Sequence, residues 1–379
     1  MLRKFGLPFL FGVGLLLLAA LGGFRHPTVA APLLQSVSND TCLACHSMDG
    51  MQKNFADGSL LVLTIDRNLF AQSVHAAEGL TCVSCHTGIT SFPHPEVKAQ
   101  TAREYTLQQV SLCKQCHAEQ FEKSMDGVHQ KALDAGNTNA AVCTDCHNPH
   151  QQLRMKDPQS GQIRVEMRRL IPQTCARCHS TIYNTYQNSV HGAALTEENN
   201  PDVPTCVDCH GIHNITDPTT AQFHNDIPLL CARCHTDPQL MAKYGLSTEV
   251  LNTYVADFHG TTVTLFEKVS ASQPSNKAVC TDCHGIHDIT RVDDPQTGIA
   301  LKQNLLLKCQ RCHPDANTET FTDAWLGHYI PDPQKYPLVY YVNLFYKIFI
   351  PAVLGGMAIF VASDIYRTLR ERVKGAKHL

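Results

Sequence analysis

The cysteines constrain this chain most, because every one of them falls in the same five-residue frame. All 18 cysteines form nine copies of C-x-x-C, and a histidine follows each copy directly. The cysteine pairs are, in chain order, Cys42 and Cys45, Cys82 and Cys85, Cys113 and Cys116, Cys143 and Cys146, Cys175 and Cys178, Cys206 and Cys209, Cys231 and Cys234, Cys280 and Cys283, and Cys309 and Cys312. The histidines that complete the frames are His46, His86, His117, His147, His179, His210, His235, His284 and His313. The fold must therefore accommodate nine copies of one reactive group.

The C-x-x-C-H frame is the attachment site of c-type haem, in which both thiols bond to the porphyrin and the histidine reaches the iron. A zinc knuckle or a redox dithiol also uses C-x-x-C, but neither needs a histidine after the second cysteine. Histidine is only 21 of 379 residues, so nine chance matches are excluded. Disulfides are excluded as well, because the frames use every thiol. The sequence predicts nine covalently attached haem c groups, with the frame histidines as proximal iron ligands.

The composition leaves little material for an ordinary hydrophobic core. Aromatic residues are only 7% of the chain, and the span from the first frame to His328 offers about 32 residues per haem. We therefore expect the haems themselves to form the core. The predicted fold is mostly α with extensive loops and low secondary-structure content, followed by one C-terminal transmembrane helix. The formal net charge is −3, and no basic stripe with interleaved aromatics suggests nucleic-acid binding.

Both ends of the chain carry apolar segments. Residues 1–30 combine two basic residues at positions 3 and 4, an apolar run over 5–21 and small residues near position 30, which is typical of a signal peptide. An uncleaved N-terminal anchor is the alternative, because the run approaches the length that spans a bilayer. Residues 31–335 form the predicted nine-haem domain.

A second apolar segment, residues 336–363, is predicted to be a transmembrane helix. Tyrosines cluster at its start, as in an interfacial aromatic belt. Residues 364–379 form a basic tail, which places the C-terminus in the cytoplasm and the haem domain on the periplasmic or extracytoplasmic side of the cytoplasmic membrane.

The histidines outside the frames reveal an internal repeat. Each copy contains a frame, a helical stretch with a histidine, a second frame and a trailing histidine. Copies cover 42–94, 113–150, 175–213 and 231–287, and a half copy runs from Cys309 to His328, giving about four and a half di-haem repeats. The histidines that match this repeat are His75, His94, His129, His150, His191, His213, His259, His287 and His328.

These nine histidines are the candidate distal iron ligands, because histidine is a natural sixth ligand of electron-carrying haem. Which histidine serves which iron stays open at this stage. His94 lies eight residues after its frame histidine, where the other trailing histidines lie three residues after theirs. His224 matches no repeat position.

The chain resembles the multihaem c-type cytochromes over residues 42–328. Its Ser-Val-His-Gly element at 189–192 and its C-H-G-x-H-x-I elements at 209–215 and 283–289 resemble the paired-haem modules of the respiratory multihaem cytochrome c superfamily. The resemblance implies covalent haems with mostly bis-histidine ligation and low potentials, arranged as an electron wire. A single C-terminal span departs from the quinol dehydrogenases of similar role, which carry an N-terminal anchor and fewer haems.

Two functions are compatible with these features. The first is electron transfer, without catalysis, between a quinone-reactive or b-type cytochrome subunit in the lipid bilayer and other redox proteins. In that case the last frame, next to the span, would be the port to the membrane. The second is a multihaem reductase for a small nitrogen or sulfur oxyanion, which needs one iron with an open or displaceable sixth position. Nine frames balanced by nine in-register histidines favour the first.

Overall fold

The computed structural model describes residues 38–89, 93–319, 330–334 and 336–375. About 54% of these residues are helical. The expected mostly α character is confirmed, but helices are more abundant than the low secondary-structure content that the sequence suggested. The strands β1 (Gln52–Asn54) and β2 (Leu60–Val62) form an antiparallel hairpin in which Gln52 faces Val62. Sequence patterns did not predict this hairpin.

We call the four repeats unit 1 (42–94), unit 2 (113–150), unit 3 (175–213) and unit 4 (231–287), and we group the helices that lie between two units with the unit that follows them. Helices in and around unit 1 are α1 (Asn39–His46), α2 (Arg67–Gln72), α3 (Val74–Ala77) and α4 (Cys82–Cys85). Unit 2 has α5 (Ala102–Gln109), the 3-10 helix η1 (Val110–Gln115), α6 (Ala118–Met125), α7 (Val128–Asp134) and α8 (Cys143–Cys146). Unit 3 has α9 (Val165–Arg168), α10 (Leu170–Ala176), α11 (Ser180–Gln187), α12 (Val190–Thr196) and α13 (Cys206–His210). Unit 4 has α14 (Ala221–His235), α15 (Pro238–Ala242), α16 (Val250–Val255), α17 (Phe258–Val269) and α18 (Cys280–His284).

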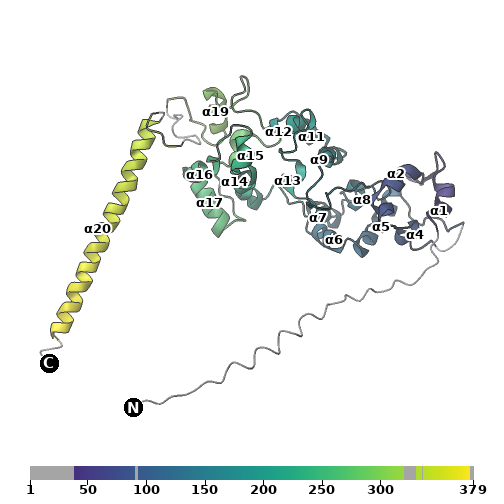
Figure 1. Ribbon diagram of the computed structural model, residues 1–379, viewed down its shortest axis with the longest axis horizontal. Helices are drawn as coiled ribbons and strands as arrows, with labels where there is room; N and C mark the ends of the chain where they lie inside the picture. Colours follow the sequence, from purple (N-terminus) through teal and green to yellow (C-terminus); the bar gives the residue numbers. More distant parts are fainter. Residues whose placement is uncertain (1–37, 90–92, 320–329, 335, 376–379) are drawn as a thin grey trace, which may run out of the picture.

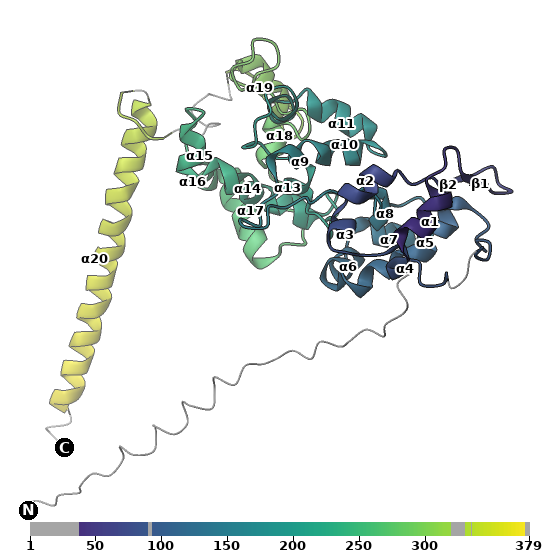
Figure 2. The ribbon, with the colours of Figure 1, turned by 45° about the vertical axis from the view of Figure 1, so that its right-hand side comes forward.

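Two further helices follow unit 4. They are α19 (Lys302–Cys309), which leads into the last frame, and α20 (Pro337–Gly375). Figures 1 and 2 show the units following one another along the molecule in sequence order, from α1 at one end to α19 near the other. The chain therefore forms an elongated row of units, as expected for a solenoid-like repeat.

The apolar core of the described residues is small and divided among the units. The one cluster of fully buried apolar side chains joins Ile227, Val263 and Val279 in unit 4, with Phe223 packed against it. Meanwhile Ile212 and Ile286, which lie between the two histidines of the Gly-Ile-His elements, are 47% and 64% exposed. Polypeptide packing alone leaves this much apolar surface open next to the frames.

The helix α20 projects away from the other helices (Figure 1). Its segment Pro337–Arg372 has a mean hydropathy of 2.0 in its most apolar window, and none of that window is buried, so it is long and apolar enough to cross a membrane. The helix runs through Pro351 without a break, and it continues into the basic residues that the sequence suggested as a separate tail. The predicted signal segment, residues 1–30, and the candidate ligand His328 lie outside the described residues.

Candidate functional site: paired histidines along the row of units

Four of the candidate histidines sit at the same place in their units, the second residue of a short helix. They are His75 on α3, His129 on α7, His191 on α12 and His259 on α17. Ser73, Ser189 and Asp257 cap three of these helices through side-chain oxygens that accept backbone N–H hydrogen bonds, whereas α7 starts after Gly127. Because a cap fixes where a helix begins, these residues also fix where each histidine points.

Each of eight frame histidines faces one histidine from outside the frames. The ring centres are 6.0–6.3 Å apart in all eight pairs. The pairs are His46 with His94, His86 with His150, His117 with His75, His147 with His213, His179 with His129, His210 with His287, His235 with His191, and His313 with His259. Eight of the nine predicted distal histidines are thus placed opposite a frame histidine. This matching leaves His284 among the frame histidines and His328 among the candidates.

The separation of the rings suits one metal ion held between two imidazoles. A metal–imidazole bond is about 2.0–2.1 Å long, and the ring centre lies roughly 1.2 Å beyond its nitrogen, so two rings on opposite sides of one ion have centres about 6.3 Å apart. The observed 6.0–6.3 Å matches this value. Direct stacking of two imidazoles would bring the rings closer. The residues present therefore fit a group that places an iron between each pair.

Seven of the eight pairs join two different units, and this is what the sequence left open. We call the histidine on the helix between the two frames of a unit the mid-unit histidine. The mid-unit histidine of one unit faces the first frame of the next unit, as His129 of unit 2 faces His179 of unit 3. The trailing histidine of one unit faces the second frame of the unit before, as His213 of unit 3 faces His147 of unit 2. Each unit therefore exchanges histidines with its neighbours in both directions.

Backbone hydrogen bonds hold the units in this arrangement. The N–H of the residue before a mid-unit histidine donates to a carbonyl two residues after the trailing histidine of the next unit. Val74 bonds Gln152 at 2.7 Å, Val128 bonds Ile215 at 2.9 Å, and Val190 bonds Ile289 at 2.8 Å. Since these bonds recur at equivalent positions, they set the same offset between units 1 and 2, 2 and 3, and 3 and 4.

Burial keeps several of the paired imidazoles in the neutral form that binds metal. Burial, followed by the neighbouring His86, lowers the pKa of His150 to about 4. Burial and the neighbouring His235 likewise lower the pKa of His191 to about 4. Burial also lowers the pKa of His129, His213 and His287. At neutral pH these side chains carry a free lone pair rather than a second proton.

The thiols show that the frames lie next to one another in sequence order. Within each unit the first cysteines of the two frames are neighbours, close enough for one thiol to shift the pKa of the other, namely Cys42 with Cys82, Cys113 with Cys143, Cys175 with Cys206, and Cys231 with Cys280.

Neighbouring units also bring thiols together. The second cysteine in the second frame of each unit has its pKa raised by burial and then by the thiols of the following frame. Cys113 and Cys116 act in this way on Cys85, and Cys175 acts on Cys146. Burial and then Cys231 raise the pKa of Cys209 to about 11, and burial and then Cys309 do the same for Cys283. All nine frames thus form one unbranched row.

The second frame of units 2, 3 and 4 contains an aspartate that sequence reasoning missed. Asp145, Asp208 and Asp282 each accept a hydrogen bond from the backbone N–H at the start of their own frame helix, at 2.7, 2.6 and 2.7 Å. In units 2 and 3 the same carboxylate also binds an arginine. The shared Cys-x-Asp-Cys-His pattern was visible in the sequence, and it fits an aspartate at the third position of a helix.

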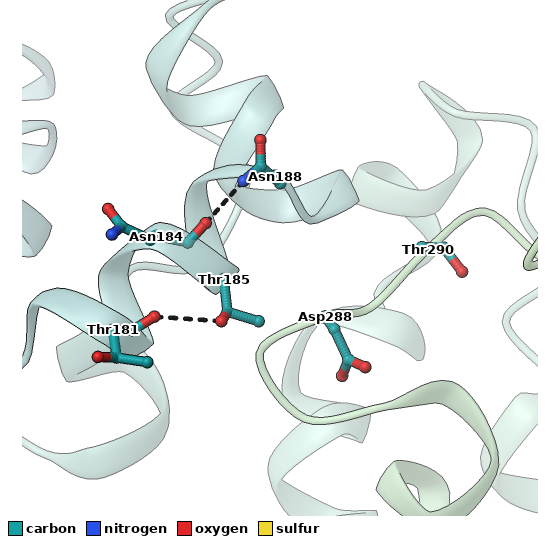
Figure 3. Close-up of a pocket in the computed structure, with 6 residues that line it drawn as sticks. All are labelled: Thr181, Asn184, Thr185, Asn188, Asp288 and Thr290. Atoms are coloured by element: carbon teal, nitrogen blue, oxygen red, sulfur yellow. Dashed lines mark hydrogen bonds between the residues drawn. The ribbon is translucent and has the colours of Figure 1, made fainter.

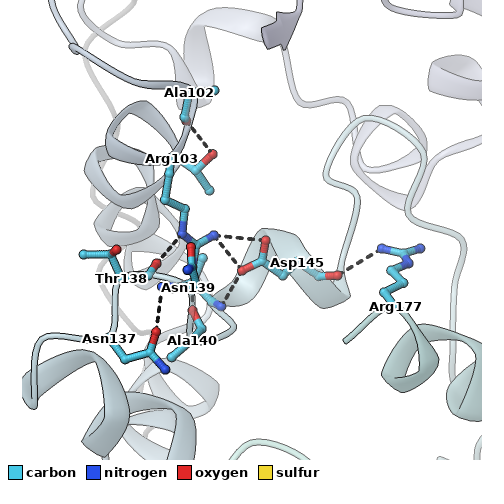
Figure 4. A network of polar contacts seen from close by, with 10 residues as sticks. Ala102, Arg103, Asn137, Thr138, Asn139, Ala140, Asp145 and Arg177 are labelled. Carbon is cyan, nitrogen blue, oxygen red and sulfur yellow. Dashed lines mark hydrogen bonds and ion pairs between the residues drawn. The ribbon is translucent and has the colours of Figure 1, made fainter. Parts of the chain in front are cut away.

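Figure 4 shows this network in unit 2. The guanidinium of Arg103 on α5 donates to both oxygens of Asp145, at 3.1 and 2.9 Å, and to the carbonyl of Thr138 at 2.6 Å. Arg177, which lies inside the first frame of unit 3, donates to the backbone carbonyl of Asp145 at 3.0 Å. One aspartate therefore connects three parts of the row, including two adjacent frames.

The same network explains the histidine that matched no repeat position. In unit 3 the cation is Arg168, which binds Asp208 at 3.0 Å from seven residues before Cys175. His224 lies seven residues before Cys231 and places its Nε2 atom 3.4 Å from Asp282. In unit 4, His224 therefore takes the place that Arg168 has in unit 3. It contacts the aspartate of the frame helix α18 and does not face another imidazole.

An open polar groove of about 480 Å³ lies between α11 and the loop after α18 (Figure 3). Thr185 and Asn188 in its wall donate to carbonyls one turn earlier on their own helix, at 3.1 and 2.7 Å. Asp288, the one ionisable group in the lining, accepts the N–H of Ile286 at 3.0 Å. The groove therefore has no constellation of groups suited to acid–base or nucleophilic chemistry.

No group of three or more His, Cys, Asp or Glu side chains converges as a metal site among the described residues. Comparisons with protein-family models, curated proteins and solved structures find no match for this chain.

Proposed function

We propose that this chain is a membrane-anchored c-type cytochrome that carries nine haem c groups and transfers electrons along them. The observation that carries the proposal is the set of eight ring pairs, each of which joins a C-x-x-C-H histidine to a histidine outside the frames at 6.0–6.3 Å. In each pair the frame histidine would be the proximal ligand and its counterpart the distal ligand. When bound, the haem iron supplies one-electron redox chemistry.

The same pattern suggests a counterpart for the remaining frame. The second frame of units 1, 2 and 3 faces a histidine of the following unit, so the second frame of unit 4 would take its histidine from the half unit, whose one histidine outside the frame is His328. We assign His328 to His284 on this basis, from its position in the sequence. All nine irons would then have two histidine ligands, which favours carrying electrons over binding substrate.

Apolar surface next to the frames supports the haem proposal independently. Ile212 and Ile286 are exposed beside the histidines of their Gly-Ile-His elements, where a porphyrin face would cover them. Burying the remaining exposed surface of each side chain against a porphyrin would stabilise it by about 1–2 kcal/mol. The expected haem core is thus compatible with the small apolar core that the polypeptide forms by itself.

The unbranched order of the frames supports a single electron path. Its last frame, Cys309 to His313, precedes α20 in the chain and would be the port to the bilayer, where a quinone-reactive or b-type cytochrome subunit would deliver or accept electrons. Its first frame, Cys42 to His46, lies at the opposite end of the row (Figure 1) and would face extracytoplasmic redox partners.

The first experiment measures haem content and iron ligation of the full-length protein, produced in a host that matures c-type cytochromes. We expect nine haems per chain in the pyridine haemochrome assay and ferric EPR signals of low-spin bis-imidazole iron. Substantially fewer haems per chain, or high-spin signals from most of the irons, would contradict the proposal.

The second experiment tests the path. The protein is held by α20 in a lipid film on an electrode, and haem reduction is followed optically. Changing Cys143 and Cys146 to alanine removes the fourth frame, so the three haems beyond it should reduce in a separate slow phase. The matched control changes Cys42 and Cys45, which removes the end of the row and should leave the reduction rate of the other haems unchanged. Equal kinetics in the two variants would rule out a single path.

A further inference from the structure

The ring pair at the first frame differs from the other seven in the origin of its distal histidine. His94 and His46 belong to the same unit, whereas every other pair joins two units. Separating any other pair would require two interlocked units to move apart. His94 can leave His46 by a movement of its own segment alone.

The surroundings of His94 restrain it less than those of its counterparts. It is the one exposed histidine among the eight described distal candidates, and the other seven are partly buried. It lies in an irregular segment, Pro93 to Gln100, where Ala99 is the one buried residue. The histidines His75, His129, His191 and His259 are built into helices, and the other trailing histidines follow their frame histidine by three residues.

Hydrogen bonding distinguishes His94 from His75 in the same way. A metal-bound histidine is normally oriented by a hydrogen bond from its other ring nitrogen to a carboxylate, a backbone carbonyl or a water. The Nδ1 atom of His75 has such a partner in the carbonyl of Pro149, at 2.9 Å and 74 residues away. The Nδ1 atom of His94 pairs with the carbonyl of Pro95, its immediate neighbour in the chain. That bond moves with the histidine and does not anchor it.

We propose that His94 is a displaceable distal ligand, and that the first frame is a binding site for a small, uncharged ligand such as carbon monoxide or nitric oxide. The inference rests on the proposed haem attachment. With haem bound, the bond between His94 and the iron would break and the incoming ligand would bond to the iron in its place, with no electron transferred in the exchange. Residues 38–100 carry six acidic and three basic side chains, so the surroundings disfavour anions and select for neutral ligands.

Titration of the dithionite-reduced holoprotein with carbon monoxide tests this site. We expect one carbon monoxide per nine haems, with a binding rate that saturates at high concentration because dissociation of His94 becomes limiting. In His94→Ala the stoichiometry should stay at one, and the rate should rise and lose its saturation. In the matched variant His150→Ala, the iron at His86 in the second frame of unit 1 would lose its distal ligand, and the stoichiometry should rise to two.

Removing the first frame locates the site. Changing Cys42 and Cys45 to alanine should abolish carbon monoxide binding, and changing Cys143 and Cys146 should preserve it. The inference is overturned if the wild-type protein binds no carbon monoxide, if binding survives loss of the first frame, or if His94→Ala binds two. Pyridine haemochrome assays on the same samples keep a failure of this inference distinct from a failure of haem attachment.

Discussion

At the scale of single residues, most frame histidines face a histidine that belongs to a neighbouring unit. His129 lies between two frames of its own unit in the sequence, yet its ring faces His179 of the next unit. Sequence spacing identified His129 as a candidate ligand but had no means to choose its partner, because that choice depends on how neighbouring units pack. The backbone hydrogen bond from Val128 to Ile215 is one such packing contact, and it joins segments far apart in sequence.

Replacing His129 with alanine should therefore affect the first frame of unit 3 and leave its own unit intact. We expect nine haems per chain, with one converted from low-spin to high-spin in the ferric EPR spectrum. His224→Ala is the control and should leave every iron low-spin. Removing Cys175 and Cys178 in the His129→Ala background should eliminate the high-spin signal. Its persistence there would contradict the pairing.

Ion pairs between a frame aspartate and an arginine outside the frames are a second feature at the residue scale. Arg168 and Asp208 have side chains that are only 17% and 37% exposed, and Asp208 also caps the frame helix α13. Breaking a charged hydrogen bond in such surroundings costs about 1.5–3 kcal/mol. An exposed pair such as Arg291 with Asp293, at 73% and 63% exposure, contributes about 0–1 kcal/mol.

We accordingly expect Arg168→Ala to lower the unfolding midpoint in guanidinium clearly and Arg291→Ala to change it little. The measurement follows loss of secondary structure by circular dichroism. His224→Arg should raise the midpoint slightly, because it gives unit 4 the permanent cation of units 2 and 3. Equal effects of the two alanine variants would contradict the role given to Arg168.

At the scale of elements, two glycines set the corner between the helices of a unit. A Cβ atom at Gly192 would lie 1.9 Å from the carbonyl oxygen of Tyr186, and one at Gly260 would lie 2.0 Å from that of Tyr254. Each glycine follows a distal histidine directly. Tyr186 is buried and donates its hydroxyl to the carbonyl of Pro204 at 2.7 Å, so the corner also contacts the chain that enters the next frame.

The variant Gly192→Ala should push α12 away from α11 and displace His191 from His235. We expect a loss of about 1–3 kcal/mol from overpacking, together with a high-spin signal from one iron. Gly88→Ala is the control, because a Cβ atom there has nothing within 4 Å. An unchanged EPR spectrum in Gly192→Ala would show that the histidine does not depend on this corner.

The sequence predicted the elements that carry chemistry better than those that only connect them. The frames, the helical stretches before the mid-unit histidines and the apolar C-terminal helix follow from local patterns of cysteine, histidine and hydropathy. The hairpin of β1 and β2 was missed, because three-residue strands carry too little alternation to be recognised. The arginine–aspartate links were missed because each joins residues 40 or more positions apart.

At the scale of the whole molecule, one helix, α20, follows the row of units in the chain and forms the proposed membrane span. A chain ending at Asp332 lacks α20 and should be released into the soluble extracytoplasmic fraction with its haem content unchanged. The full chain should stay with the membranes after alkaline carbonate extraction. Retention of the shortened chain in the membrane would show that the N-terminal apolar run remains as an anchor rather than being cleaved.

The exchange of histidines between neighbouring units also bears on how such chains can change length. Each internal unit gives one histidine forward and one backward, and it receives one from each side. Removing a whole internal unit would therefore bring donor and acceptor positions together again without an orphaned ligand, whereas removing half a unit would leave one. Gene-level deletion or duplication can thus shorten or lengthen the molecule two frames at a time, so its reach from the membrane is a quantity that evolution can adjust in fixed steps.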